Sequence, residues 1–351
     1  MKQMKNKLIF IGPILQGQLA QGGDTMKNQL FLQRFSQVYD CVIAIDTFGW
    51  KKRPWVFGQL VWTLLTHRNT PVVISANPGS ADTLIKFIHA IRLDKNVVYW
   101  VVGGSFHDMI ADGRFSKNHY RNLKAILVQG QSMADSLCKN GLYNARYVPN
   151  SKIINRLATK NPKTDNITHF VFLSRIEESK GCKLIFESVD ELNNQGYKGR
   201  FDVMFYGKMS EDAEFANYFE KTISEHDEIK YGGLLNLRDE KNYDVLAQYD
   251  VMIFPTFWHG EGFPGIVIDA YIASLPIIAT DWNLNKDVIK EGETGWIIPI
   301  HDVQALTERM KHAIEHPEIV AEMSANSGKL ALQYDSRKVL SEEHLKEIGI
   351  L

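Results

Sequence analysis

The amino-acid sequence predicts an α/β protein built from two doubly wound, Rossmann-like domains with parallel sheets. Short runs rich in Val and Ile recur along the chain, with helical stretches between them. Such runs, continuous rather than alternating, are typical of parallel strands buried on both faces. The length of 351 residues suits about two domains. The two halves also differ sharply in charge, as expected for domains with different partners.

In the first half, each apolar run predicts one strand. The runs cover residues 8–11, 41–45, 72–74, 97–102 and 125–128. A glycine-rich loop follows the first run and ends at Gly22 and Gly23. Asp24 is a good N-cap residue, so we expect it to cap a helix that continues through Phe35.

The second half repeats the same alternation. Its predicted strands are 170–173, 201–206, 251–254, 275–279 and 296–298. Strands and helices at this spacing predict doubly wound sheets. The polar stretch after Val148 marks the boundary, so we expect domains at residues 1–150 and 151–333. The last segment, 334–351, has the pattern of a helix.

The two halves of the chain differ in net charge. Residues 1–150 contain 18 Lys and Arg, 8 Asp and no Glu, which gives a net charge of +10. The remaining residues contain 22 Lys and Arg and 33 Asp and Glu, which gives a net charge of −11. A basic domain attracts lipid headgroups, lipid diphosphates or nucleic acid. Drift in surface composition is the alternative explanation.

The chain gives no sign of membrane insertion or secretion. No apolar run approaches the ~20 residues that span a bilayer. The run at 8–11 is too short for a signal-peptide core, so we expect a cytoplasmic protein. Three widely spaced cysteines match neither a disulfide framework nor a zinc site. We expect reduced thiols in the core.

The most informative segment joins a buried strand to a helix between two carboxylates, Glu261 and Asp269. Gly262 and Gly265 free the backbone, and Pro264 suits the first helical position, where its missing N–H costs nothing. A helix start attracts phosphate oxygens. Carboxylates suit sugar hydroxyls. The segment therefore indicates a site for a sugar joined to a nucleotide diphosphate, although a plain tight turn would show the same glycines.

A second segment places two cations, Arg175 and Lys180, in the loop after another strand. Negative charge grows on a diphosphate as it leaves a sugar. Arg can grip it with a planar fork, and Lys supplies a mobile point charge. The alternative is a solvated loop in which Arg175 pairs with Glu177 or Glu178.

Together these segments resemble retaining glycosyltransferases of the GT-B fold, in particular glycosyltransferase family 4 (glycosyl transferases group 1). The family patterns are E-G-F-G/P-x-x-x-x-E and G-R-x-x-x-x-K-G. This chain departs from these patterns at two positions. Asp269 stands where the family has Glu, and Ser174 stands where the family has Gly. The resemblance implies two Rossmann-like domains facing a central cleft, with the C-terminal helix crossing back to the N-terminal domain.

The resemblance also implies roles for individual residues. Glu261 would contact hydroxyls of the donor sugar, Asp269 the ribose, and Arg175 and Lys180 the departing diphosphate. His107 would pack near the transferred sugar, although a lone histidine at a turn is more often merely exposed. The remaining residues expected at the donor are Gly262, Phe263, Pro264, Gly265, Gly207, Gly232, Gly233, Gly22 and Gly23.

The implied activity is transfer of a sugar from a nucleotide-diphosphate sugar to a saccharide or lipid-linked saccharide, in surface polysaccharide biosynthesis. The chain has no Asp-x-Asp motif, so we expect no metal and no other cofactor. One segment mixes aromatic residues with three successive basic residues, which predicts peripheral contact with an anionic membrane at the inner face of the plasma membrane. They are Trp50, Lys51, Lys52, Arg53 and Trp55. A loop followed by a buried helix start is the alternative.

Other functions remain open at this stage. A nucleotide-sugar epimerase shares the fold class, and a non-catalytic nucleotide-sugar binder would share the donor site. An oxidoreductase would need G-x-G-x-x-G after the first strand, which the chain lacks. Nucleic acid is not an expected partner, because the second half is acidic and no recognition motif is present.

Overall fold

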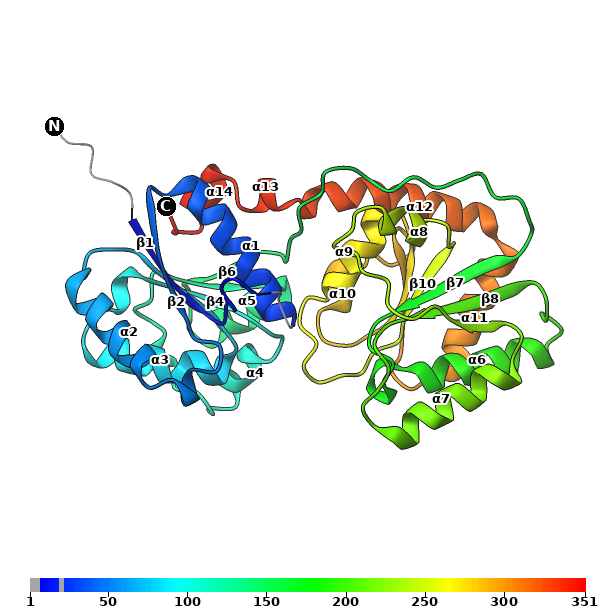
Figure 1. The fold of residues 1–351 in the computed structure, drawn as a ribbon, viewed down its shortest axis with the longest axis horizontal. Coiled ribbons are helices and arrows are strands. Elements are labelled where there is room, and N and C mark those ends of the chain that lie inside the picture. Colours follow the sequence, from blue (N-terminus) through cyan, green and yellow to red (C-terminus); the bar gives the residue numbers. More distant parts are fainter. Residues whose placement is uncertain (1–6, 19–21) are drawn as a thin grey trace. The chain divides into compact units, whose positions relative to one another are not determined.

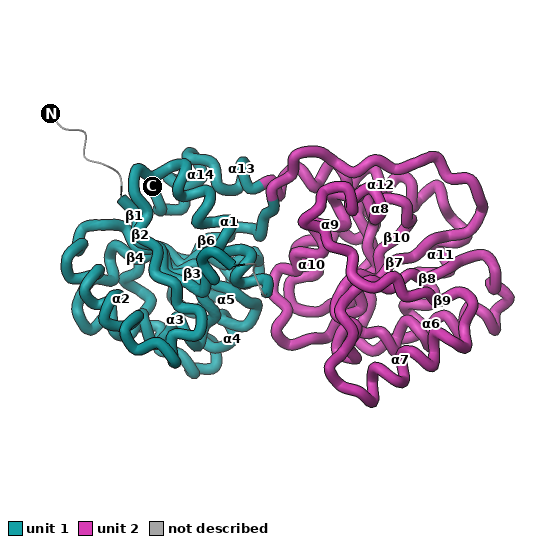
Figure 2. The backbone as a smooth tube through the Cα atoms, in the orientation of Figure 1, with its two compact units in different colours: residues 1–152, 336–351 teal, residues 153–335 magenta. Residues whose placement is uncertain are grey.

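A computed structural model describes residues 7–18 and 22–351 and divides the chain into two compact units (Figures 1 and 2). The first unit contains Met1–Lys152 and Ser336–Leu351, and the second contains Ile153–Asp335. The chain therefore returns to the first unit at its C-terminal end. The expectation about a signal peptide falls partly on residues 1–6, which lie outside the described residues.

Six parallel strands form the sheet of the first unit, in the order β2-β1-β3-β4-β5-β6. Their bounds are β1 Lys7–Gly12, β2 Cys41–Asp46, β3 Val72–Ala76, β4 Val97–Val101, β5 Ala125–Val128 and β6 Ala145–Tyr147. The five predicted strands are confirmed. The sixth was missed, because its three residues contain no apolar run.

Helices cover both faces of this sheet, with α1 and α14 on one face and α2 and α3 on the other (Figure 1). Their bounds are α1 Gly23–Val38, α2 Trp55–Thr66, α3 Pro78–Ala90, α4 Phe106–Ala111, α5 Gln131–Lys139, α13 Ser336–Val339 and α14 Glu342–Glu347. The predicted N-cap of α1 is wrong by two positions. Gly22 is the cap, and Asp24 lies inside the first turn, where its carboxylate accepts a hydrogen bond from the N–H of Thr25.

The C-terminal tail packs into the core of the first unit. Leu340, Leu345 and Ile350 are fully buried in the same cluster as Phe35 of α1. The Tyr39 hydroxyl donates a hydrogen bond to the carbonyl of Ile350 at 2.5 Å. The tail is two short helices rather than the single helix predicted, because Ser341 interrupts the pattern and caps α14 through the N–H of His344.

The second unit also has six parallel strands, in the order β12-β11-β10-β7-β8-β9. They are β7 Thr168–Leu173, β8 Phe201–Tyr206, β9 Ile229–Tyr231, β10 Val251–Phe254, β11 Ile277–Thr280 and β12 Gly295–Ile298. Their helices are α6 Cys182–Asn194, α7 Ala213–Glu225, α8 Asn242–Leu246, α9 Gly265–Ile272, α10 Asn285–Val288, α11 Val303–Glu315 and α12 Pro317–Ala331. The five predicted strands are present, and the short, partly exposed β9 was missed. Each unit is thus a doubly wound parallel sheet.

An aromatic core fixes the start of α6 against the sheet of the second unit. The ring of Phe205 on β8 lies 5.1 Å from that of Phe172 on β7 and 5.5 Å from that of Phe186 on α6. Phe219 on α7 completes the group, 5.3 Å from Phe205. Such contacts add to the hydrophobic burial of large rings. They hold the loop between β7 and α6 in place, and that loop carries Lys180.

Helix α2 leaves an apolar stripe in solvent on the first unit. Trp55 and Trp62 are 65% and 72% exposed and lie two turns apart on one helix face, and Leu65 follows one turn later. Among residues 7–18 and 22–351, none of the helices combines the length and hydropathy needed to cross a bilayer.

The three cysteines are free. Cys182 is fully buried, and burial raises the pKa of its thiol. The expectation of core thiols is wrong for Cys41, which is exposed because β2 forms an edge of its sheet.

Candidate active site

The candidate site lies where the strand order of the second unit reverses. Strands β7 and β10 are neighbours at the centre of the sheet, and the chain winds outward from them in opposite directions. In open α/β sheets, ligands bind outside the carboxyl ends of the strands at such a switch point. The loops 174–181 and 255–264 leave the sheet at this point, and they carry both predicted motifs.

The backbone ties these two loops together. The N–H of Phe257 donates to the carbonyl of Ser179 at 2.9 Å. Gly181 ends the first loop in the left-handed conformation, with φ of 82°, and a Cβ there would lie 2.3 Å from the carbonyl oxygen of Pro255. Only glycine fits such a position without strain. Gly181 therefore lets the start of α6 approach the end of β10 and brings Lys180 to the second loop.

The centre of the site is an ion pair between Lys180 and Glu261. The ammonium nitrogen lies 2.5 Å from the carboxylate oxygen, and the two side chains are only 5% and 12% exposed. A buried charge is costly unless it is paired. This pair joins the predicted diphosphate motif directly to the predicted sugar motif.

The indole of Trp258 lies against both cations. The Lys180 nitrogen is 4.3 Å from the centre of this ring, and the Arg175 guanidinium carbon is 5.0 Å from it. These are cation–π distances. Arg175 also pairs with Glu177 at 2.7 Å and is 47% exposed, so the pairing considered as an alternative is present. An exposed guanidinium on an aromatic face is free to turn toward a ligand.

Neighbouring groups hold the Trp258 segment in shape. The Trp282 indole N–H donates to the carbonyl of Trp258 at 2.8 Å, and the Asn283 amide donates to the carbonyl of Glu261 at 2.8 Å. The ring of Trp258 lies over Gly260, where a Cβ would come within 2.5 Å of it. The ring therefore needs glycine at that position to reach the two cations.

The structure places Asp269 in the interior of the unit. This residue is on α9 and is 4% exposed, and the hydroxyl of Tyr243 on α8 donates to its carboxylate at 2.5 Å. Burial and the charge of Asp269 raise the pKa of Tyr243. The Asp269 carboxylate thus joins α8 to α9, and its expected contact with ribose stays a prediction.

The residues between the two acids form the turn into α9. Phe263 is buried, with its ring 5.5 Å from that of Tyr334. Helix α9 begins at Gly265, so Pro264 is its N-cap and not the first helical residue as predicted. Gly262 lies in the bend before it. Because α9 follows β10, the N–H groups of its first turn lie at the carboxyl edge of the sheet.

Three further predicted glycines meet beside the Arg175 loop. The N–H of Gly207 donates to the carbonyl of Gly233 at 2.8 Å. A Cβ on Gly207 would lie 1.6 Å from the carbonyl oxygen of Ser174, and one on Gly232 would lie 2.3 Å from the ring of Tyr206. These glycines permit close packing of the loops after β7, β8 and β9.

The N-terminal candidates belong to the first unit. Gly22 caps α1, with its N–H donating to the hydroxyl of Thr25 at 3.1 Å, and Gly23 is the first helical residue. His107 is the second residue of α4 rather than a turn residue, and its Nε2 lies 3.4 Å from Asp108. Its Nδ1 is buried and finds no hydrogen-bond partner in the described part of the chain. These residues follow β1 and β4, at the carboxyl ends of their own sheet.

Sequence reasoning missed Trp258 and Tyr243. Trp258 stands three positions before Glu261, inside the segment that carries the motif, so an aromatic residue next to two cationic positions was a usable signal. Tyr243 lies 26 residues before Asp269. Nothing in the sequence links those two.

Two doubly wound parallel-sheet units, one carrying paired cations and a carboxylate at its switch point, define the GT-B architecture of sugar-nucleotide enzymes. The chain belongs to the family described as glycosyl transferases group 1, which matches residues 154–330.

Curated relatives and solved structures agree with this assignment. The chain is 26% identical over 194 residues to the capsular polysaccharide biosynthesis glycosyltransferase CapM of Staphylococcus aureus, covering 54% of this chain and 48% of that one. It is 24% identical to the amylovoran biosynthesis glycosyltransferase AmsK of Erwinia amylovora, covering 38% of this chain and 33% of the relative. The matched stretch thus spans less than half of these relatives' length.

The fold is that of two solved structures. The complex of Anabaena Alr3699/HepE with UDP superposes with a TM-score of 0.73 at 13% identity, covering 98% of this chain and 100% of that chain. The apo form of the lipopolysaccharide outer core galactosyltransferase WaaB gives the same score, identity and coverage.

Proposed function

We propose that the chain is a retaining glycosyltransferase of family 4 that transfers a hexose from a nucleotide-diphosphate sugar to a saccharide or lipid-linked saccharide. One observation carries the proposal: Lys180, Arg175 and Glu261 gather around one indole ring at the switch point of the second unit. A diphosphate needs cations, and a sugar needs hydrogen-bond acceptors. The loops after β7 and β10 supply both from one edge of the sheet.

The chemistry follows from these groups. The bond between the anomeric carbon and the phosphate oxygen breaks, and its electron pair stays on the diphosphate. Arg175 and Lys180 stabilise that growing charge, which is electrostatic catalysis. The acceptor oxygen forms the new bond on the face that the diphosphate leaves, and its proton passes to a phosphate oxygen. Glu261 holds the sugar hydroxyls while this occurs.

Uridine diphosphate sugars are the donors that we propose to test first. HepE, which shares the fold, has been crystallised with UDP and with UDP-glucose. A panel of UDP-, GDP- and ADP-sugars is compared by thermal shift, because a ligand that binds the native state raises Tm by mass action. The base that raises Tm in the unchanged protein and not in Lys180→Ala identifies the donor. No shift from any nucleotide would contradict a donor site.

A metal is not part of the proposed reaction. Two cations already neutralise the diphosphate, so turnover with the identified donor is expected to continue in excess EDTA. Activity that disappears in EDTA and returns with Mg²⁺ or Mn²⁺ would show that a metal shares this task.

Two other functions remain as alternatives with distinct outcomes. An epimerase would convert the nucleotide sugar without releasing nucleotide. A non-catalytic binder would give the thermal shift and nothing more. Acceptor-dependent release of UDP, with NMR showing the same anomeric configuration in product and donor, is the result expected for a retaining transferase.

We propose that the acceptor is a growing surface polysaccharide, which is assembled at the cytoplasmic face of a membrane. CapM and AmsK are named for capsular polysaccharide and amylovoran biosynthesis. The stripe of Trp55, Trp62 and Leu65 on α2 follows directly after Lys51 and Lys52, and exposed aromatic residues beside cations suit an anionic bilayer surface.

Vesicle sedimentation tests this contact. We expect Trp55→Gln/Trp62→Gln to reduce binding to phosphatidylglycerol vesicles several-fold, with Tm unchanged because both side chains are exposed. Met26→Gln changes another exposed large apolar residue of the first unit, on α1, and serves as the control. Equal vesicle binding by all three proteins would contradict membrane contact through α2.

A further inference from the structure

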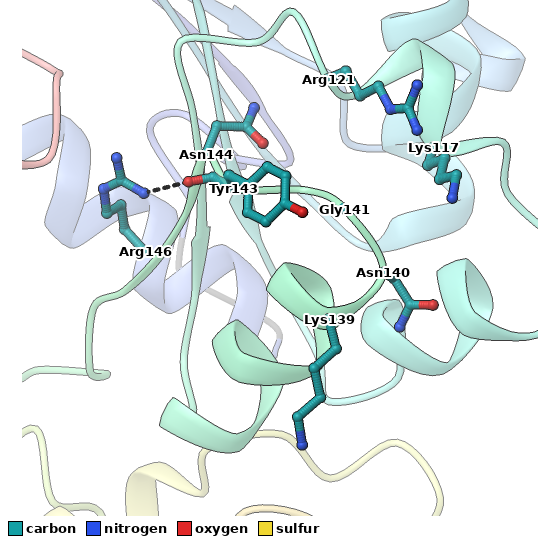
Figure 3. Close-up of a pocket in the computed structure, with 8 residues that line it drawn as sticks. All are labelled: Lys117, Arg121, Lys139, Asn140, Gly141, Tyr143, Asn144 and Arg146. Carbon is teal, nitrogen blue, oxygen red and sulfur yellow. Dashed lines mark hydrogen bonds between the residues drawn. The ribbon is translucent and has the colours of Figure 1, made fainter.

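A basic groove lies on the first unit, away from every residue assigned above (Figure 3). It has a volume of about 820 Å³, in the range of small-molecule sites. Its lining includes Lys117, Arg121, Lys139, Tyr143 and Arg146, with two asparagines and a glycine and without any carboxylate. Figure 3 shows Lys117 and Arg121 on one side of the Tyr143 ring and Arg146 on the other.

The groove belongs to the opposite edge of the sheet from the predicted substrate residues of this unit. Its lining comes from the segment before β5 and from the end of α5 with the loop that leads into β6. In a parallel sheet these are the amino ends of the strands. Gly22, Gly23 and His107 follow carboxyl ends. The groove is therefore separate from the face that the family fold uses for sugar transfer.

The cations of the groove are not neutralised. Within residues 7–18 and 22–351, the structure gives no ion pair to Lys117, Arg121 or Lys139. Arg146 donates only to backbone carbonyls, those of Tyr143 at 2.8 Å and Ala145 at 2.9 Å. Like charges gathered around a concave surface focus a positive potential and attract anions. This groove holds part of the positive charge that sets residues 1–150 apart.

The Asn144 side chain and Gly141 also hold the groove in shape. The Asn144 amide donates to the carbonyls of Tyr120 at 2.9 Å and Leu123 at 2.8 Å, which fastens the loop before β6 to the segment before β5. Gly141 turns the chain after α5 with φ of 85°. Tyr143 follows in the same loop and is 78% exposed. This loop thus presents an aromatic ring between cations to solvent.

We propose that this groove is a second anion site, which binds the phosphate group of a phosphorylated ligand. The guanidinium of Arg121 offers paired N–H donors that match phosphate oxygens, and Lys117 and Lys139 add mobile charges. The exposed Tyr143 contributes a hydroxyl and a flat apolar face for the organic part of the ligand. The phosphate belongs either to a free metabolite or to a lipid headgroup.

Calorimetry and vesicle binding separate these two sources. Inorganic pyrophosphate is titrated into the full chain in saturating UDP, and the same protein is sedimented with phosphatidylglycerol and phosphatidylcholine vesicles. The test variant is Lys117→Ala/Arg121→Ala. The matched control is Arg68→Ala/Lys95→Ala, which removes one Arg and one Lys from other exposed positions of the same unit. Thermal melting confirms that both variants fold.

If the ligand is a free phosphorylated molecule, pyrophosphate binds saturably. The test variant then raises its Kd at least about tenfold, or roughly 1.4 kcal/mol of binding free energy, and the control variant changes it by no more than about twofold. If the ligand is a lipid headgroup, the test variant loses binding to anionic vesicles only, and the control variant keeps it. Equal losses in the test and control variants, or no loss in either assay, would overturn the proposal. Neither result depends on whether the second unit transfers sugar, because each compares variants of the first unit.

Discussion

The ammonium of Lys180 and the carboxylate of Glu261 stand 81 residues apart in the sequence and meet at 2.5 Å beside the ring of Trp258. The motifs expected to bind the two ends of a donor are therefore joined by one ion pair. We propose that an arriving diphosphate takes the lysine and that the glutamate then binds sugar hydroxyls. Pairing stabilises both charges in a largely buried position.

We expect a diphosphate to recruit Arg175 more easily than Lys180, since Arg175 is half exposed and its ion pair with Glu177 lies at the surface. We expect Arg175→Ala to lower kcat roughly 10²- to 10³-fold with the identified donor, because one preorganised charge at the leaving group is lost. Tm should change little. The control is Lys183→Ala, which removes another exposed cation of the same region. Full turnover by Arg175→Ala would remove this residue from the mechanism.

Trp258 is expected to hold the two cations in place. Cation–π contacts contribute about 0.5–1 kcal/mol each at exposed sites and more when desolvated. Trp258→Ala should therefore weaken UDP binding by roughly tenfold. Trp258→Phe keeps an aromatic face and should recover most of the affinity. If calorimetry gives all three proteins the same Kd for UDP, the ring has no such role.

The hydrogen bond from Tyr243 to Asp269 is expected to support stability more than substrate binding. Tyr243→Phe removes a donor from a buried carboxylate and should lower the free energy of unfolding by about 1–3 kcal/mol. Tyr143→Phe removes an exposed hydroxyl and is the control. Urea denaturation measures both. A larger effect on UDP affinity than on stability would place Asp269 in contact with the ligand.

The buried ammonium of Lys27 is expected to make the stability of the first unit depend on pH. Its ammonium lies 5.2 Å from the centre of the Phe31 ring and 5.5 Å from that of Trp100, with no hydrogen-bond partner found for it where the chain is described. Burial lowers its pKa from 10.5 to about 7. Between these values the unfolded chain binds a proton that the native state does not, so stability rises with pH.

The slope is up to about 1.4 kcal/mol per pH unit for one group. Lys27→Met should abolish this rise between about pH 7 and pH 10, and it should be the more stable protein below pH 7. Denaturation at several pH values compares the two proteins. Parallel curves would mean that the native ammonium keeps its ordinary pKa.

Much of the fold could be predicted because buried parallel strands leave a strong sequence signal. Runs such as Val97–Val101 and Val251–Phe254 are continuous and apolar, and every run named in advance is a strand. Strands β6 and β9 were missed, since three residues that include Arg146 or Lys230 carry no such signal. Helix starts were displaced by one or two positions, because glycine and proline permit several turn geometries.

The positions of the candidate residues in the fold could be predicted from the sequence, but the contacts between them could not. Spacing alone placed Arg175, Lys180 and Glu261 at strand ends. It could not show that Lys180 reaches Glu261, because that depends on how closely Gly181 lets two loops approach. It also could not show Tyr243 beside Asp269, since that contact depends on the packing of α8 against α9.

A crystal structure of the chain with UDP bound tests the central claim most directly. The account predicts the pyrophosphate within hydrogen-bonding distance of Arg175 and Lys180, near the first turn of α9, with the bond between Lys180 and Glu261 broken. A pyrophosphate bound elsewhere, with that ion pair intact, would contradict it.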